Sequence, residues 1–210
     1  MSRRGEAGQP GMGIVTADIA ITLDGFGAGA GQSLEHPFGD LDERPLHSWM
    51  FDHREENAAE VDAIVDAGAF IMGRNMFTPG RGEWGPDWRG WWGEDPPYHA
   101  PVFVLTHHER EPVPMEGGTT FHFVTDGIDA ALGLARAAAG DRNVAVAGGA
   151  TTINAYLAVD AIDELRLHVV PFTSGLTEGS RMFDGVPALG LLPAATRHTP
   201  HVTHLTYRRA

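Results

Sequence analysis

The sequence predicts a single α/β domain in which a largely parallel sheet carries helices on both faces. Three observations support this fold class. Short apolar runs alternate along the chain with segments of helical spacing. Two of those runs leave through glycine turns, as strands do in parallel α/β sheets. We find neither an internal repeat nor a second domain, and 210 residues are enough for one full core.

The first part of the chain contains two expected strands and one expected helix. Ile14 to Leu23 predicts a strand that ends at Asp24-Gly25, and a glycine-rich loop is expected from Gly25 to about Pro45. Between Asn57 and Ala67 apolar residues recur at helical spacing, which predicts a helix. The apolar run Ala69–Met72 predicts a short buried strand.

A long irregular loop is expected over residues 78–101. It contains five prolines and four of the five tryptophans. Long loops inside compact domains are usually functional or disordered, and aromatic residues argue against disorder. The tryptophans can either cover an edge of the core or wall a flat aromatic substrate by stacking. We favour the substrate role for Trp84, Trp88 and Trp92, while Trp91 belongs to the same group.

The second half of the chain alternates strand and helix patterns. Its expected strands are Val102–Leu105, Phe121–Val124, Val144–Ala147, Leu165–Val170 and a late sheet strand, His201–Arg208. Its expected helices are Ile128–Ala139 and Ile153–Ala158. This alternation is what predicts parallel strands joined by helical crossovers.

Composition limits the class of protein. Residues 1–12 are polar and glycine-rich and are expected to be a disordered tail, with one domain over residues 13–210. That tail lacks the apolar block of a secretory signal, and no apolar run has the ~20 residues that span a bilayer. Cysteine is absent, which excludes disulfides and thiolate chemistry and fits a cytoplasmic location.

Charge and ligand spacing exclude further classes. The formal net charge of −13 argues against nucleic acid, which requires a basic footprint. All fifteen basic residues are arginine, so a lysine Schiff base and a P-loop lysine are excluded. The histidines show no HExxH pattern, and adjacent His107 and His108 point to opposite sides of a strand. We therefore expect no metal site.

Two strand–glycine turns are candidate anion sites. In Val144–Leu157, a strand of small residues ends at Gly148-Gly149, and Thr151 or Thr152 can cap the helix that follows. The first N–H groups of such a helix lack intrahelical partners and bind phosphate. At Gly73-Arg74 the arginine adds a planar donor group for phosphate. Taken alone, the Gly148-Gly149 pair is more often a tight turn, and Arg74 is equally a surface charge near a loop. Together the two turns suit a dinucleotide across strand carboxyl ends.

Five segments, taken in order, resemble the dihydrofolate-reductase-like superfamily and, more closely, its RibD C-terminal type, the reductase domain of riboflavin biosynthesis. They are Ile19–Phe26, Phe70–Phe77, Pro101–His107, Val146–Ala150 and Asp163–His168. The similarity covers roughly Gly13 to Arg208. It implies a central, mostly parallel sheet that ends in an antiparallel C-terminal strand.

The resemblance also implies NADPH as cofactor and assigns residues to it. Gly73, Arg74 and Asn75 are expected at the phosphates, and Thr106 and His107 at the adenosine ribose. Arg110 is a candidate for the 2′-phosphate, and Leu23, Asp24 and Gly25 are expected beside the nicotinamide. The pyrophosphate is expected on Gly148, Gly149, Ala150, Thr151 and Thr152. The family often has a cis peptide between the paired glycines, which suggests one at Gly148–Gly149.

The catalytic acid is assigned from the resemblance, because riboflavin-type reductases place an aspartate after the second helix–strand unit and Glu94-Asp95-Pro96-Pro97 stands at roughly that place. Hydride reduction of a C=N or C=O bond needs a proton at the other atom. We expect Asp95 to supply it, with Asp24 as the alternative, although Asp95 before proline is equally a turn residue. Gln32, Glu35 and His36 are expected to close over the nicotinamide side, with Gln32 near the substrate.

The leading hypothesis is therefore an NADPH-dependent reductase of a small planar heterocyclic or conjugated substrate, similar to 5-amino-6-(5-phosphoribosylamino)uracil reductase or dihydrofolate reductase. Two alternatives remain: a ligand-binding protein of the same fold without turnover, and an FMN-binding oxidoreductase. The family implies a homodimer, for which the apolar segments Leu165–Phe172 and Leu189–Leu192 are the hints in the sequence.

Overall fold

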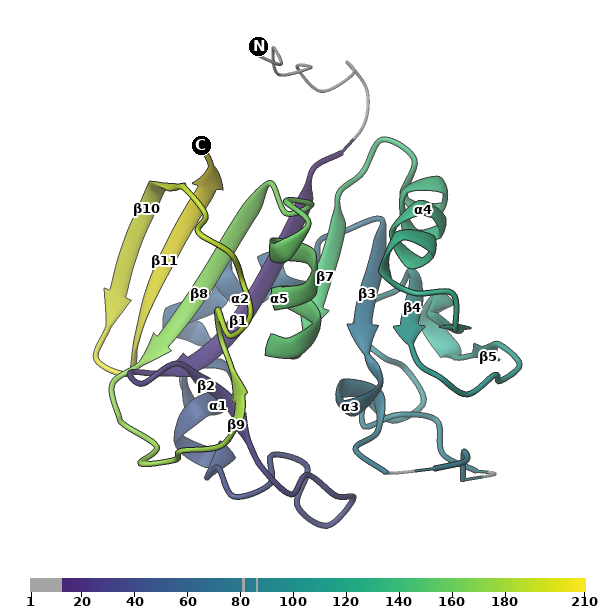
Figure 1. The fold of residues 1–210 in the computed structure, drawn as a ribbon, viewed down its shortest axis with the longest axis horizontal. Coiled ribbons are helices and arrows are strands. Elements are labelled where there is room, and N and C mark those ends of the chain that lie inside the picture. The colour runs from purple at the N-terminus through teal and green to yellow at the C-terminus, as the bar shows by residue number, and fades with distance from the viewer. Residues whose placement is uncertain (1–12, 81, 86) are drawn as a thin grey trace.

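The computed structural model describes residues 13–80, 82–85 and 87–210, so the expected disordered tail of residues 1–12 lies outside the described residues. Figure 1 shows an α/β fold built on one large sheet. The strands are β1 (Val15–Thr22), β2 (Phe26–Gly29), β3 (Ala69–Gly73), β4 (Pro101–Leu105), β5 (Val113–Pro114), β6 (Thr120–Val124), β7 (Val144–Gly148), β8 (Glu164–Val170), β9 (Gly179–Arg181), β10 (Leu191–Thr199) and β11 (Val202–Arg209). The helices are α1 (Glu43–Phe51), α2 (Ala58–Val65), α3 (Arg74–Phe77), α4 (Ile128–Ala139) and α5 (Ala150–Ala158), with 3-10 turns η1 (Glu55–Asn57) and η2 (Glu116–Gly118).

The large sheet has nine strands in the order β10-β11-β8-β1-β7-β3-β4-β6-β5. Its six middle strands, from β8 to β6, are parallel to one another. β11 runs antiparallel to β8, β10 antiparallel to β11, and β5 antiparallel to β6. The predicted fold class, a mostly parallel sheet with an antiparallel C-terminal strand, is confirmed. A separate small sheet pairs β2 with β9.

Helices cover both faces of the sheet, as predicted. In Figure 1, α4 and α5 lie in front of the sheet, and α1 and α2 lie behind it. The front helices pack on a buried cluster that includes Val15, Ile71 and Val146. Behind the sheet, α1 and α2 cover a second cluster that includes Ala20 and Val170. β3 and β7 place apolar residues in buried clusters on both faces, which explains why they read as continuous apolar runs. β1 and β8 differ, because they also carry the buried polar residues Asp18 and His168.

The first loop contains two elements that the sequence pattern does not reveal. β2 is only four residues long and glycine-rich, and its partner β9 lies about 150 residues further along the chain. α1 begins at Glu43, so Pro45 lies in its first turn. Proline fits there because the first N–H groups of a helix have no intrahelical acceptor. The Asp42 side chain caps this helix by accepting a hydrogen bond from the Arg44 N–H at 3.1 Å.

The C-terminal region corrects one expectation about assembly. β8 lies inside the sheet, between β11 and β1, so the apolar segment Leu165–Phe172 is not at an edge. The true edge is β10, which is exposed along most of its length and has no alternating apolar pattern. For that reason the sequence predicted only the inner strand of this hairpin. Leu192, in the second segment proposed for assembly, is 56% exposed.

Candidate functional site

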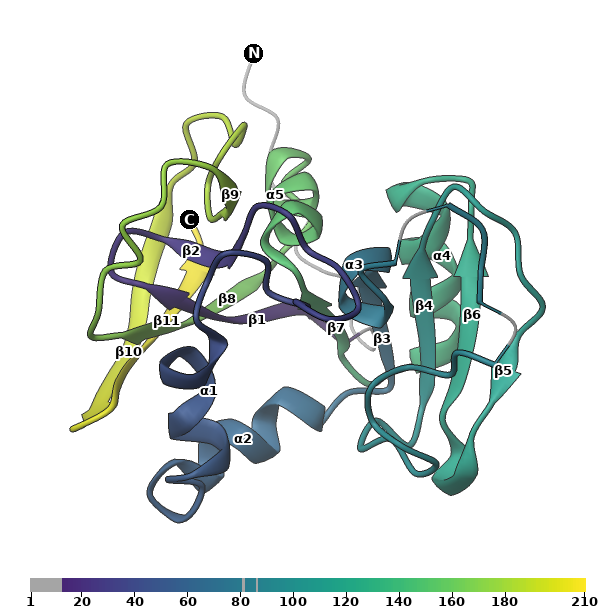
Figure 2. The same ribbon diagram turned by 90° about the horizontal axis from the view of Figure 1, so that it is seen from below.

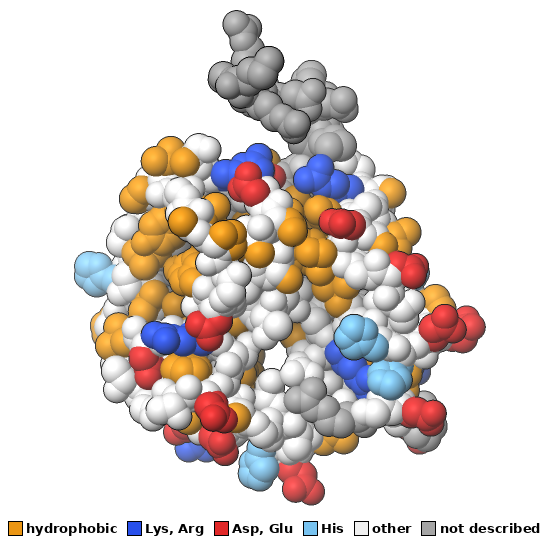
Figure 3. Space-filling model, in the orientation of Figure 1, with side chains coloured by type: hydrophobic (Ala, Val, Ile, Leu, Met, Phe, Trp, Pro, Cys, Tyr) orange, Lys and Arg blue, Asp and Glu red, His pale blue; other side chains and the backbone are white. Residues whose placement is uncertain are grey.

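The candidate site lies at the edge where the parallel strands end. Because β1, β3, β4 and β7 run in the same direction, their carboxyl ends bring Gly25, Gly73, Thr106 and Gly148 to one edge of the sheet. Figure 2 views the molecule from this side, with α3, α5 and the first loop in view. In the space-filling view the surface is hollowed at the lower edge, below α5 (Figure 3).

The Gly148–Gly149 turn has the geometry expected of an anion site. The peptide bond between these residues is cis, as the resemblance suggested. α5 begins at Ala150, three residues earlier than predicted, and the Thr152 and Ile153 N–H groups both donate to the Gly149 carbonyl, at 3.0 and 3.1 Å. The N–H groups ahead of those bonds are the ones that helix geometry leaves for an anion.

The threonines after this turn do not cap the helix, contrary to the first expectation. Gly149 is the N-cap residue and no side chain caps it. The Thr151 hydroxyl instead lies 3.2 Å from the Ser180 hydroxyl. The helix starts too early for either threonine to precede it, because small residues allow Ala150 to enter the first turn directly.

The two predicted glycine turns touch each other. β3 and β7 are neighbours, with Met72 opposite Gly148. A Cβ atom built on Gly73 would overlap Oγ1 of Thr152, whereas one on Gly148 would meet Sδ of Met76 at 3.4 Å. Gly73 is thus required by close packing, and the two turns form one continuous backbone surface.

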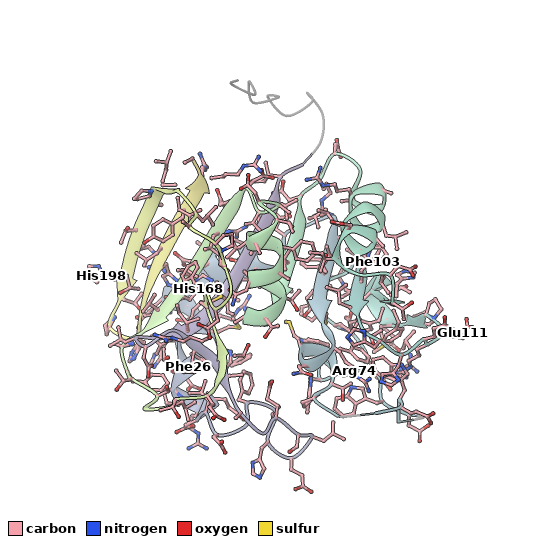
Figure 4. The ribbon with its side chains drawn as sticks, in the orientation of Figure 1. Phe26, Arg74, Phe103, Glu111, His168 and His198 are labelled. Carbon is pink, nitrogen blue, oxygen red and sulfur yellow. The ribbon has the colours of Figure 1, made fainter. Side chains whose placement is uncertain are left out.

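Arg74 follows this surface and reaches toward the tryptophan loop. Its Nη2 donates to the Gly82 carbonyl at 2.5 Å, and its guanidinium carbon lies 4.2 Å from the centre of the Trp84 ring. In Figure 4 the labelled Arg74 side chain lies on the side of α3 that faces this loop. The cation is therefore positioned by both a hydrogen bond and a ring face.

A cleft of about 400 Å³ opens between α3 and the start of α4. It is lined by four of the predicted cofactor residues, Arg74, Asn75, Thr106 and His107. Gly127, at the start of α4, also lines it and was not predicted. The sequence does contain a pattern that could have predicted Gly127, because Thr125-Asp126-Gly127 is a third strand–glycine–helix junction. The cleft size is within the usual range for small-molecule sites, ~300–1,000 Å³.

Thr106 and His107 have different roles at the wall of this cleft. Thr106 is buried, and its hydroxyl accepts a hydrogen bond from the His108 N–H at 3.1 Å. That bond shapes the turn after β4. His107 is exposed at the cleft, where its ring is available to a ligand.

Arg110 is not among the residues that line the cleft, and its expected contact with a 2′-phosphate stays a prediction. Its Nη2 donates to the Trp88 carbonyl at 2.6 Å. Its guanidinium carbon lies 5.2 to 5.9 Å from the ring centres of Phe77, Trp84 and Phe123. Burial and the charge of Arg89 lower its pKa. The aromatic rings draw this arginine inward, an effect that spacing in the sequence cannot show.

The tryptophan loop packs on the core. Trp84, Trp88 and Trp92 are half-buried against the cluster that contains Phe70 and Phe121. The indole nitrogen of Trp84 donates to the His108 carbonyl at 3.1 Å, and that of Trp88 to the Phe77 carbonyl at 2.9 Å. These contacts match the core-covering alternative. A stacking role toward substrate stays a prediction.

Asp24 is fixed in the turn after β1. Its carboxylate accepts bonds from the Thr22 hydroxyl at 2.6 Å, the Ser174 N–H at 2.9 Å and the Ser174 hydroxyl at 2.8 Å. Burial raises its pKa, but these hydrogen bonds outweigh burial and hold the pKa well below its usual range. Leu23 beside it is 60% exposed. An ionised carboxylate with these donors positions the turn and is a poor proton donor.

Asp95 lies away from the other predicted residues. It is exposed, and its Oδ1 is 3.6 Å from Nδ1 of His99, just before β4 begins. The same carboxylate is next to Gly117, just before β6. These are the amino ends of parallel strands, so Asp95 is at the sheet edge opposite the glycine turns. This position separates Asp95 from the glycine turns, and its role as the catalytic acid stays a prediction.

The first loop reaches the second glycine turn. Nδ2 of Asn75 donates to Oε1 of Gln32 at 3.0 Å, and Leu34 lies beside Gly80. Figure 2 shows this loop extending from β2 to α3. Glu35 and His36 are exposed at its tip. Gln32 thus lies at the candidate site, although its expected contact with substrate is untested.

Three supporting residues were missed by the sequence reasoning. Ser174 holds Asp24, and Arg181 donates from Nε to the Asp24 carbonyl at 2.8 Å. Asn154 of α5 is buried, and it donates to the Arg181 carbonyl and accepts from the Phe183 N–H. They could not be predicted from local sequence patterns, because each forms its hydrogen bonds with residues more than 25 positions away in the chain. Together they tie the ends of β1, α5 and β9 into one unit.

Metal-binding clusters and membrane-spanning helices are both absent from the described part of the chain. Within residues 13–80, 82–85 and 87–210, no group of three or more His, Asp or Glu side chains is arranged to hold a metal ion. Over the same residues, no helix has the length and apolar character to cross a membrane.

Comparisons with known proteins match the fold and these motifs. The model of the RibD C-terminal domain family matches residues 14–205. A protein of Shewanella sp. PV-4 described as a putative riboflavin biosynthesis protein has a similar structure, with a TM-score of 0.63, 21% identity and coverage of 94% of this chain and 99% of that one. No curated protein matches.

Two further solved structures share the fold at lower identity. The deaminase/5-amino-6-(5-phosphoribosylamino)uracil reductase of Thermotoga maritima has a TM-score of 0.56 and 17% identity, over 95% of this chain but 57% of its own length. Dihydrofolate reductase of Enterococcus faecalis, complexed with NADP(H), has a TM-score of 0.50 and 15% identity, over 94% of this chain and 97% of that one. At such identities the likeness shows the fold.

Proposed function

The chain belongs to the RibD C-terminal domain family, and from this premise we propose that it is an NADPH-dependent reductase of a small planar heterocyclic or conjugated substrate. The observation that carries the proposal is the contact between two strand–glycine turns at the carboxyl edge of the sheet. Gly149 leaves open space where a side chain would otherwise project, and Gly73 lets the first turn of α5 pack against the end of β3. This is the position where dinucleotides bind in open α/β sheets.

The residues present suit a nicotinamide dinucleotide. The start of α5 and the Gly148–Gly149 turn would hold the pyrophosphate through N–H groups. Arg74 and Asn75 would add phosphate donors, and Thr106 and His107 would border the adenosine side of the cleft. Leu23 and Gly25 would flank the nicotinamide. When bound, the cofactor supplies the hydride.

The proton has a separate source. Asp24 is ionised and occupied by four donors from Thr22, Ser174 and Gly175, so its role is to fix the turn beside the nicotinamide. With Asp24 ionised, another group must supply the proton. This arrangement also favours the second candidate function, a nucleotide-binding protein of the same fold without turnover.

Calorimetric titration with NADPH, NADH and FMN tests the proposal. We expect NADPH to bind, and Gly73→Ala to weaken it at least about tenfold, since a shift in the turn displaces the phosphate donors. Gly133→Ala is the matched control, because a Cβ there meets no atom within 4 Å. If neither nicotinamide nucleotide binds at millimolar concentration, the proposal is wrong, and binding of FMN alone would favour a flavoprotein.

A second measurement separates the two candidate functions. Oxidation of bound NADPH is followed with 5-amino-6-(5-phosphoribosylamino)uracil, dihydrofolate, quinones and imines as acceptors. Turnover with any of them identifies a reductase and its substrate class. Binding of NADPH without turnover across the panel identifies the binding protein.

We also propose that the chain forms a homodimer, through the side that carries β10 and β11. Figure 3 shows apolar side chains over this side of the molecule. Leu192, at the start of the edge strand, is 56% exposed. Light scattering should give a dimer mass that Leu192→Arg lowers, while Leu134→Arg on α4, where Leu134 is 49% exposed, does not. A monomer at micromolar concentration contradicts the proposal. The cytoplasmic location stays a prediction.

A further inference from the structure

Three Asp-Gly pairs lie between the helices and strands of this chain: Asp24-Gly25, Asp126-Gly127 and Asp184-Gly185. An aspartate before glycine can isomerise spontaneously, because the glycine nitrogen attacks the side-chain carboxyl carbon and closes a five-membered imide. Glycine favours this attack since it has no Cβ to hinder the approach. In a folded protein the reaction also requires a carboxyl group and a peptide that are free to rotate. The three pairs differ in exactly this freedom.

Asp24 is held too firmly to react. Its carboxylate accepts hydrogen bonds from four donors, in Thr22, Ser174 and Gly175. The Gly25 N–H is also engaged, because it donates to the Thr22 carbonyl at 2.9 Å. Against the opposing effect of burial, the hydrogen bonds hold the pKa of the Asp24 carboxyl well below its usual range. The group therefore stays an ionised and fixed carboxylate, which resists nucleophilic attack.

Asp184 is exposed, but its backbone is fixed in a turn. The Val186 N–H donates to the Phe183 carbonyl at 3.2 Å and closes this turn around Asp184-Gly185. Asn154 holds the turn as well, since its Nδ2 donates to the Asp184 carbonyl at 3.3 Å and its Oδ1 accepts from the Phe183 N–H at 2.9 Å. Rotation of the Asp184 peptide toward its own side chain must break these bonds.

Asp126-Gly127 has neither kind of restraint. Within the described part of the chain, no hydrogen bond or ion pair involves Asp126, and the Gly127 N–H donates to no acceptor. Both residues are exposed, as is Thr125 before them. The φ and ψ angles of Gly127 are 88° and −174°, a region that is essentially confined to glycine. The fold thus requires glycine after Asp126 and leaves the carboxyl group free to approach its nitrogen.

This pair stands at the wall of the cleft. Asp126-Gly127 joins the end of β6 to the start of α4, and Thr125, Gly127 and Ile128 line the cleft. A change in the length of the backbone at residue 126 therefore moves residues that face the cleft.

We propose that Asp126-Gly127 is a site of spontaneous isoaspartate formation and that this modification damages the cleft. The Gly127 nitrogen bonds to Cγ of Asp126, and the hydrogen of that nitrogen leaves with the carboxyl hydroxyl as water. A water molecule then opens the imide at the main-chain carbonyl, which becomes a free carboxylate, so that the backbone runs through Cγ. One water is released and one is consumed, so neither the mass nor the oxidation state changes. The product has one extra methylene in the backbone between β6 and α4.

The modification does not depend on the proposed function, whereas its effect on NADPH rests on that function. Ageing of the full chain at neutral pH tests the modification. Isoaspartate is detected by methyl transfer from S-adenosylmethionine with an isoaspartyl methyltransferase, and peptide mapping then assigns it to a residue. The same chain unfolded in urea gives the rate for each pair without any structural restraint.

We expect isoaspartate at Asp126 first, at a rate within about threefold of its rate in the unfolded chain, since no structure must open. At Asp24 the folded chain should react at least about tenfold more slowly than the unfolded one, because hydrogen bonds must break first. Protection of Asp126 equal to that of Asp24, or an earlier reaction at Asp184, overturns the proposal.

Three variants test the chemistry at this position. In Asp126→Glu the modification should disappear, because the longer side chain would have to close a six-membered ring. Asp129→Glu, at an exposed position in the first turn of α4, is the matched control and should leave the reaction at Asp126 unchanged. Asp126→Asn should age faster, with a rise in mass, because ammonia leaves more readily than water as the same imide forms. Unchanged ageing in Asp126→Glu, or no acceleration in Asp126→Asn, contradicts the assignment.

Titration with NADPH tests the effect on the cleft. The isoaspartate form, separated from aged protein by chromatography, should bind NADPH at least about tenfold more weakly than fresh protein, because the residues that line the cleft are displaced. Aged Asp126→Glu should keep the affinity of its fresh form. Equal affinity of the isoaspartate form and fresh protein contradicts the effect on the cleft. If fresh protein binds no nicotinamide nucleotide, the proposed function fails, while the peptide map still decides the modification.

Discussion

Gly73 and Thr152 are packed so closely that no Cβ atom fits at residue 73 without displacing the threonine hydroxyl. Gly73 ends β3, and Thr152 lies in the first turn of α5. This contact joins two turns that are about 75 positions apart in the chain. It explains why a glycine stands at the end of β3 better than backbone conformation does, since the φ angle of Gly73 is −75° and suits any residue.

The first prediction concerns this contact. Gly73→Ala should lower the free energy of unfolding by about 1–3 kcal/mol, the usual cost of overpacking. The measurement is urea denaturation. Thr152→Ala removes the obstructing oxygen, so the double variant should recover most of the loss. If Thr152→Ala adds its own destabilisation without any recovery, the two residues do not obstruct one another.

The parallel core was predictable because a strand that is buried on both faces is apolar at every position, and such a run can be seen in the sequence. Runs such as Val144–Ala147 are apolar at every position, and β7 forms there. The glycine turns were predictable for a related reason, because glycine after such a run marks a close approach. Arg74 and Thr106, which lie next to those turns, line one cleft, while their cofactor role stays a prediction.

Features set by distant partners could not be read in the same way. Arg110 is drawn into rings contributed by Phe77 and Phe123, which spacing does not bring together. Asp95 lies at the sheet edge opposite the glycine turns, a position that could not be predicted because an irregular loop has no periodic pattern. β10 is exposed on both faces, so it shows neither alternation nor a continuous apolar run.

The second prediction is that Asp24 stabilises the turn after β1 and does not donate a proton. Asp24→Asn should cost about 1–3 kcal/mol of unfolding free energy at pH 7, because an amide cannot accept from all of these donors. Asp126→Asn, at an exposed position, is the control and should change little.

The same comparison has a defined pH dependence. The folded pKa of Asp24 is lowered, so the stability that it contributes is present above its unfolded pKa, about 3.9. It is lost as the pH falls through the folded pKa. The difference between the unaltered protein and Asp24→Asn should therefore shrink below about pH 4. A difference that grows on acidification would mean that the carboxyl is protonated in the folded state.

The third prediction separates packing from substrate contact in the tryptophan loop. Trp84 contacts Phe77 and Phe123, and both Arg74 and Arg110 lie over its ring. Trp84→Ala should cost about 3 kcal/mol or more of unfolding free energy, as large-to-small core substitutions do. Trp91→Ala is the control, because Trp91 is 41% exposed. This substitution should cost less than about 1 kcal/mol of unfolding free energy. Equal small effects at both positions would instead leave Trp84 free for substrate.

The fourth prediction rests on the lowered pKa of His204, about 4 in the folded protein. Its unfolded value is about 6.5, so between these values the unfolded chain binds more protons than the folded one. Stability should therefore rise with pH across this window, by up to about 1.4 kcal/mol per pH unit from this residue, and be fully present above pH 6.5. The pKa of His47 is also lowered to about 4 by burial, so it adds to the same slope.

Chemical denaturation at pH 4.5, 5.5 and 6.5 measures this dependence of stability on pH. The slope should be smaller in His204→Phe than in the unaltered protein, and His47→Phe is the comparison for the second contribution. An unchanged slope in His204→Phe would show that this histidine titrates alike in the folded and unfolded chain.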